Sequence, residues 1–200
     1  MDIDKSLLLA GVGMPVLYFV ALFAAGALYP DYSHIRQVAS DLGAVGAPYA
    51  FAPVFNVALV GVALAGLAGA LGLGLGLQTL GVNRFLSAAT GLAPAMPSIS
   101  LGMSGLFPLP SPYHSSFMLL LAGMLTPVLG ALALRKLPGT GAIRLTLYLA
   151  FAAALIVVGI IFGIGEVVTD ENLGLWLRIW AAVTLPAFGV LCLAVRQRLP

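Results

Sequence analysis

The sequence predicts an all-α integral membrane protein, a bundle of six transmembrane helices that forms a single domain over residues 1–200. Three observations predict this class. Hydrophobic residues make up 61% of the chain and charged residues only 8%, whereas a soluble domain carries about 25% charged residues. Six apolar runs approach the length of about 20 residues with which a helix crosses the hydrocarbon core. None of them alternates apolar and polar residues as a membrane-spanning β-barrel would.

The six expected spans follow one another with short connections, except for one long connection after the first span. They cover residues 7–28, 51–77, 85–106, 117–134, 143–165 and 173–195. The second is long enough to tilt in the bilayer, and the fourth is the shortest. A net charge of +2 excludes a nucleic-acid partner. The single cysteine, Cys192, excludes an intrachain disulfide.

Basic residues predict the orientation of these spans, because cytoplasmic connections of membrane proteins are enriched in lysine and arginine. With six spans, both termini and the second and fourth connections lie on one side of the membrane. Seven of the nine basic residues fall there, and they are Lys5, Arg84, Arg135, Lys136, Arg144, Arg196 and Arg198. Only Arg36 and Arg178 fall on the other side. We therefore expect both termini in the cytoplasm.

The first outer connection, residues 29–50, has the spacing of a short amphipathic helix lying at the membrane interface. Ser33 is a suitable residue to begin it and Gly43 to end it. One polar face would carry His34, Gln37 and Asp41. An adjacent face would carry Ser33, Arg36 and Ser40.

The other outer connections add His114, at the start of the fourth span, and Glu166, ahead of the sixth. Arg178 lies inside the sixth span, where a charge must reach outward or find a partner. Ionisable groups at such depths mark functional sites by default.

The third span combines prolines with serines, namely Pro94, Pro97, Ser98, Ser100 and Ser104. A polar, proline-containing stretch at this depth must face protein or a water-filled cavity. We expect an outward-facing cavity that has its floor near Pro97 and Ser100 and its roof in the first outer connection. The alternative is a kinked helix whose serines bond their own backbone.

Several short motifs resemble the prokaryotic membrane family called domain of unknown function 998. They are Tyr29-Pro30, Tyr32-Ser33-His34, Ser40-Asp41-Leu42-Gly43-Ala44 with Pro48, and Phe107-Pro108 with His114. The resemblance implies a bundle of about six helices in a prokaryotic plasma or inner membrane, and it implies no activity.

The function that we expect first is binding or transport of a small molecule or a lipid headgroup at the outer face, with the bilayer as the surrounding partner. An anionic group would lie between arginines and hydroxyls. The expected binding residues are Ser33, His34, Arg36, Ser40, Asp41, Ser100, Ser104, His114 and Arg178. A transporter of six spans is small, so a homodimer is a further expectation.

Other interpretations stay open, and the binding or transport function does not itself require a cofactor. A metal-dependent membrane hydrolase would bind a divalent metal through His34, Asp41 and His114, with Glu166 at the same site as a general base. His34 and His114 would also suit a tetrapyrrole, and Ser40, His114 and Asp41 a nucleophilic site. In a last, structural interpretation, these residues fix the outer face of a structural or assembly subunit of a membrane complex.

Overall fold

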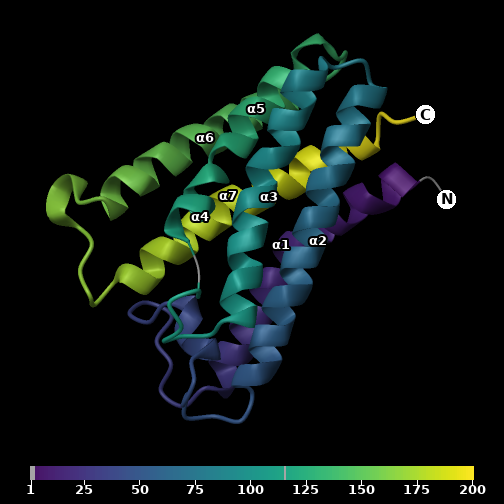
Figure 1. Cartoon of the computed structure of the whole chain (residues 1–200). Coiled ribbons are helices and arrows are strands. Elements are labelled where there is room, and N and C mark those ends of the chain that lie inside the picture. Colours follow the sequence, from purple (N-terminus) through teal and green to yellow (C-terminus); the bar gives the residue numbers. More distant parts are fainter. Residues whose placement is uncertain (1–2, 115) are drawn as a thin grey trace.

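The computed structural model describes residues 3–114 and 116–200, and these residues form helices and loops without a strand. Three short 3₁₀ helices, η1 (Ala39–Gly43), η2 (Leu134–Lys136) and η3 (Ile164–Glu166), lie in connections. The α-helices are α1 (Ile3–Leu28), α2 (Ala52–Thr79), α3 (Arg84–Leu106), α4 (Phe117–Ala122), α5 (Leu125–Ala133), α6 (Gly141–Ile161) and α7 (Leu173–Arg196) (Figure 1).

Five helical stretches in the described chain are long and apolar enough to cross a membrane. They are α1, α2, the stretch from Phe117 to Lys136, α6 and α7. This confirms the all-helical class and the membrane character. Helix α3 matches the expected third span in place and has 23 residues, but its serines and prolines keep it outside that apolar set.

The helices pack as a bundle in which α2 lies between α1 and α3, and α7 contacts α1, α5 and α6 (Figure 1). Close approach of α1 and α2 depends on small residues. A Cβ added to Gly11 would lie 2.9 Å from the Cα of Gly69. Such contacts let backbones pack tightly where the hydrophobic effect between helices is absent.

The fourth apolar run is interrupted, because α4 ends at Ala122 and α5 begins at Leu125. Gly123 lies at the interruption and contacts α3, where an added Cβ would be 2.9 Å from Pro97 Cγ. The fifth run also ends earlier than residue 165. Helix α6 stops at Ile161, and Gly163 follows in the left-handed region at φ +97°, a usual end for a helix.

The expected amphipathic helix in the first outer connection is wrong in extent. Only an isolated turn, with Gln37 N–H donating to Ser33 O at 2.9 Å, and the 3₁₀ helix η1 form there. The reason is that α7 uses the carbonyls that such a helix needs. Ile35 O accepts from Leu175 N–H at 2.8 Å, and Arg36 O accepts from Gly174 N–H at 3.3 Å. These donors are N–H groups that a helix N-terminus leaves unpaired.

Candidate functional site

Arg178 lies on the second turn of α7 and holds the first outer connection against that helix. Arg178 as a whole residue is 9% exposed. Nη1 donates to Gln37 O at 2.8 Å and to Gly174 O at 2.7 Å. Nε donates to His34 Nδ1 at 3.2 Å, and Nη2 donates to Tyr32 Oη at 2.6 Å. We call Arg178 and these partners the outer clamp.

The donors and acceptors of the outer clamp match one another. Tyr32 accepts from Arg178 and donates its own hydroxyl proton to Val38 O at 2.8 Å. Burial raises the pKa of Tyr32 to about 12, despite the opposing charge of Arg178, so the phenol stays protonated. Burial, and secondly Arg178, lower the pKa of His34. A neutral His34 is the form that can accept from Arg178.

Arg178 has no acidic partner, since no carboxylate in the described ranges lies within 4 Å of it. Asp41 acts on Arg178 only from farther away. Its Oδ2 accepts from Val38 N–H at 3.1 Å, which closes the start of η1. Burial raises the pKa of Asp41, while the Val38 N–H and the charge of Arg178 oppose that rise.

Ser33 and Arg36 of the first connection face its own backbone or solvent, whereas Ser40 lies at the cavity described below. Ser33 Oγ accepts from Arg36 N–H at 3.3 Å. The guanidinium of Arg36 lies 3.8 Å from the Glu171 carboxylate, and both side chains are exposed. Arg36 and Arg178 therefore have separate partners and do not together enclose an anion site.

The expected metal ligands have separate surroundings. His114 is buried, with Nδ1 2.9 Å from Phe107 O and Nε2 without a hydrogen-bond partner. Glu166 is exposed in η3 with a left-handed backbone, φ +51°. Within the described ranges, no three side chains of histidine, cysteine, aspartate or glutamate gather as a metal site requires. The divalent metal and the tetrapyrrole stay predictions.

The serines of α3 bond to the backbone of their own helix, as the alternative interpretation predicts, with one exception. Ser98 Oγ donates to Pro94 O at 2.8 Å, and Ser104 Oγ donates to Ser100 O at 3.0 Å. Ser100 instead bonds across to the start of α4, donating to Ser116 O at 3.1 Å and accepting from Ser116 N–H at 3.2 Å. Helix α3 continues through both prolines.

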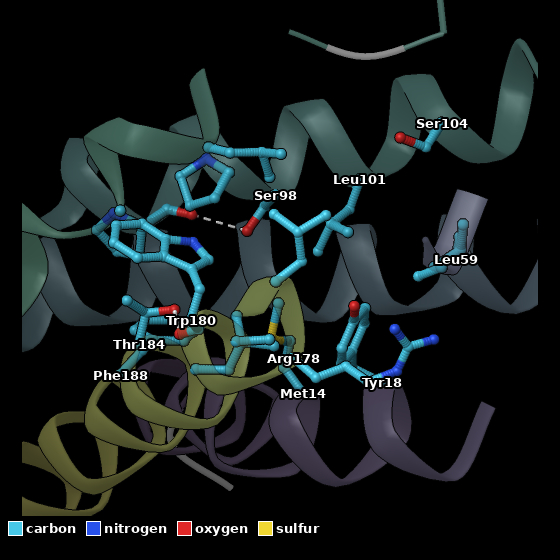
Figure 2. A pocket seen from close by; sticks show the side chains of 18 of the residues that line it. Met14, Tyr18, Leu59, Ser98, Leu101, Ser104, Arg178, Trp180, Thr184 and Phe188 are labelled. Atoms are coloured by element: carbon cyan, nitrogen blue, oxygen red, sulfur yellow. Dashed lines mark hydrogen bonds between the residues drawn. The ribbon is translucent and has the colours of Figure 1, made fainter. Parts of the chain in front are cut away.

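A cavity of about 150 Å³ lies between α1, α3, α4–α5 and α7, directly inward of the outer clamp (Figure 2). Pro94, Pro97 and Ser98 of α3 line it, and Val38 to Ser40 of the first connection lie at its outer end. This is the position that the sequence predicts, except that Ser100 is not part of the lining. Most of the other lining side chains are apolar, including Met14, Leu59, Leu101, Leu177 and Phe188.

Sequence reasoning missed the polar groups that matter most in this cavity. Tyr18 of α1, Thr126 of α5 and Trp180 of α7 all line it. In the part of the chain that the structure describes, the Tyr18 hydroxyl, the Thr126 hydroxyl and the Trp180 indole N–H make no hydrogen bond. The signal was weak, because one tyrosine, threonine or tryptophan in an apolar run is ordinary in a membrane helix.

Thr126 is exceptional among the buried hydroxyls. The buried hydroxyls that bond to a backbone carbonyl are those of Ser87, Thr90, Ser98, Ser100, Ser104, Thr140 and Thr184. Thr126 is 1% exposed, and its Oγ1 has no hydrogen-bond partner among the described residues. It follows the interruption at Gly123, where the carbonyl one turn earlier belongs to the end of α4.

The fold and these contacts define a polytopic helical membrane protein with an internal cavity beneath its first long loop. The chain belongs to the family described as "Protein of unknown function (DUF998)", whose sequence profile matches residues 12–195. This confirms the resemblance noted from the motifs. No curated protein and no solved structure matches the chain.

Proposed function

We propose that this protein binds a small, mainly apolar molecule in the cavity between α1, α3, α5 and α7. The cavity itself is the observation that supports the proposal. Its lining combines many apolar side chains with a few polar groups, the usual composition of a small-molecule site. At about 150 Å³ it has the size of an engineered apolar cavity that binds benzene.

The position of the cavity suits a ligand that arrives from the outer face. Val38, Ala39 and Ser40 cover one end, and the loop that carries them is attached to α7 through Arg178. Binding loops are drawn from the less stable parts of a protein, and few helical hydrogen bonds hold this loop. Opening it would expose the cavity to the outer interface.

Calorimetric titration of the purified protein in detergent with benzoate, benzyl alcohol and toluene tests this proposal. We expect saturable binding of at least one of these ring-sized probes. Ala181→Phe, which fills the cavity from α7, should abolish it. Ala142→Phe, on the exposed start of α6, is the matched control because partition into micelles affects both variants equally. The proposal fails if no probe binds, or if the cavity-filling variant binds like the control.

The proposal includes six spans in a prokaryotic plasma or inner membrane, with both termini in the cytoplasm. Contacts at one end of the bundle support it. Arg198 Nη2 donates to Gly139 O at 3.3 Å, and Arg196 Nε donates to Lys5 O at 3.3 Å. Both termini therefore lie beside the basic fourth connection. At the opposite end, Val45 N–H donates to Leu109 O at 2.8 Å.

Cysteine labelling in intact cells tests the orientation, since the native Cys192 is buried. Val45→Cys should react with a membrane-impermeant maleimide before permeabilisation, and Lys136→Cys only afterwards. The opposite pattern would reverse the orientation. Labelling of both sites in intact cells would contradict the six-span arrangement.

A second candidate function is that of a structural subunit, and the outer clamp favours it. Three N–H groups of Arg178 hold the first outer connection and a fourth bonds within α7, so this charge serves the shape of the outer face. A shaped outer face is what an assembly partner would recognise. Crosslinking in native membranes followed by purification tests this, because one recurring partner at stoichiometric yield would support it and its absence would reject it.

A further inference from the structure

The polar groups of the cavity indicate what kind of ligand it selects. Resting on the binding function above, we propose that the ligand is a monocarboxylate with a ring-sized apolar body. Its carboxylate would lie at the end of the cavity formed by Tyr18 and Arg178, and its apolar body toward Trp180 and Phe188 (Figure 2).

The charge at this end of the cavity is the first reason. Arg178 is among the residues that line the cavity, it is 9% exposed, and no carboxylate in the described ranges lies within 4 Å of its guanidinium. It has five N–H groups, of which the outer clamp uses four, so one on Nη2 is left. The N-terminus of α7 adds a partial positive charge close by.

The charged groups around Arg178 do not neutralise its positive charge. Asp41 is the acidic residue that acts on it, and its Oδ2 is already bonded to Val38 N–H. Glu171 pairs with Arg36 at the exposed surface. His34 accepts from Arg178 as the neutral form. A buried cation gains most from an anion that completes its pairing in a low-dielectric setting.

The free hydrogen-bond groups are the second reason, because they are mostly donors. Tyr18 interacts electrostatically with Arg178 and its hydroxyl makes no hydrogen bond within the described part of the chain. The indole N–H of Trp180 lies at the other end of the cavity, beside the apolar body of the ligand (Figure 2). At the Arg178 end, a carboxylate gives the Tyr18 hydroxyl and the remaining Arg178 N–H an acceptor, whereas a protonated amine gives them none.

The apolar remainder of the lining is the third reason. Pro97, Leu101 and Leu185 are among the apolar residues that line the cavity, and they offer contact without hydrogen bonding. The ligand must therefore be amphiphilic and short. A ring or a chain of a few carbons fits a volume of about 150 Å³, whereas the whole of a long acyl chain does not.

Calorimetric titration of the full-length protein in detergent tests the ligand class, with benzoate, hexanoate, benzyl alcohol, toluene and benzylamine as probes. We expect the two carboxylates to bind at least about tenfold more tightly than toluene, and benzylamine to bind no better than toluene. A preference for benzoate over hexanoate, or the reverse, separates a ring from a chain within the same class. Equal affinity for acids and neutral probes would overturn the carboxylate assignment and leave the cavity site standing. Absence of binding by every probe would overturn both.

Tyr18→Phe is the variant that tests the recognition, because it removes one hydroxyl and keeps the ring. It should lower benzoate affinity by about tenfold, the order expected for a hydrogen bond to a charged group, and leave toluene affinity unchanged. Tyr148→Phe, on an exposed face of α6, is the matched control. Unchanged benzoate affinity in Tyr18→Phe would contradict the placement of the carboxylate.

Discussion

The outer clamp and the cavity lie next to each other and handle buried polar groups in opposite ways. In the clamp, Arg178, Tyr32 and His34 all have partners at 2.6–3.2 Å. In the cavity, the hydroxyls of Tyr18 and Thr126 make no hydrogen bond within the described structure, and only that of Thr126 is fully buried. Paired groups contribute to folding, whereas groups that face a cavity without a partner are available to a ligand.

This difference separates residues that hold the outer face in shape from residues that are available to a ligand. The polar residues that the sequence marks most clearly, in the first outer connection, belong mainly to the clamp. The available groups lie one layer deeper, on α1, α5 and α7. Substitutions of Tyr32 and His34 should therefore change stability, and substitutions in the cavity should change binding, while Arg178 belongs to both regions and should affect both.

Arg178→Met should have the largest effect. It leaves Gln37 O, His34 Nδ1 and the Tyr32 hydroxyl without a donor. We expect a loss of about 3–5 kcal/mol in the free energy of unfolding, as for breaking other buried charged networks, measured by denaturant titration in detergent micelles. Arg36→Met removes an exposed arginine and should change stability by less than about 1 kcal/mol. Equal effects of the two would remove the distinction between clamp and surface.

Gly174→Ala tests the contact between α7 and the first connection without removing a polar side chain, although the added Cβ would also lie 2.8 Å from Arg178 Nη1. An added Cβ would clash with Gln37 O and lie 2.9 Å from Ile35 O. Because these are backbone atoms, the loop must shift, at a cost of about 1–3 kcal/mol. Gly61→Ala in α2 meets nothing within 4 Å and should be neutral or slightly stabilising. The thermal midpoints of the two variants check this.

Two tyrosine substitutions compare the regions directly. Tyr32→Phe removes the acceptor for Arg178 Nη2 and the donor to Val38 O, and should cost about 1.5–3 kcal/mol. Tyr18→Phe removes a hydroxyl without a partner and should change stability by less than about 0.5 kcal/mol. If Tyr18→Phe destabilises the protein as much as Tyr32→Phe, the Tyr18 hydroxyl has a structural partner and the contrast is wrong.

The smallest effect should be the dependence of stability on pH through His34. Its pKa is lowered in the folded protein, so the unfolded chain binds the proton more readily. The contribution is complete above the unfolded pKa of about 6.5 and declines as the pH falls below that value. Thermal midpoints at pH 8 and pH 5.5 should differ less in His34→Gln than in the unaltered protein. An identical difference would show that other groups cause it.

The sequence predicted the position of the cavity better than it predicted which residues line the cavity. The prolines and serines of α3 indicated a cavity below the first connection, and Pro97, Ser98 and Ser104 line it. The assignment of Ser100 to its floor was not supported, because that hydroxyl bonds to the backbone of Ser116. The interfacial helix was also overextended. No continuous helix forms there, because N–H groups at the N-terminus of α7 bond to Ile35 O and Arg36 O, about 140 positions earlier in the chain.

The sequence by itself determined the class of the molecule and the approximate position of every long helix. Low charge and six apolar runs are sufficient for that, because the bilayer imposes a length and a composition on each span. Only the tertiary structure decided which polar groups are paired. Arg178 and Tyr18 look alike in the sequence, as isolated polar residues within apolar helices. Within the described residues Arg178 has four hydrogen-bond partners and the Tyr18 hydroxyl has none, because pairing depends on which distant groups the packing of the helices brings within reach.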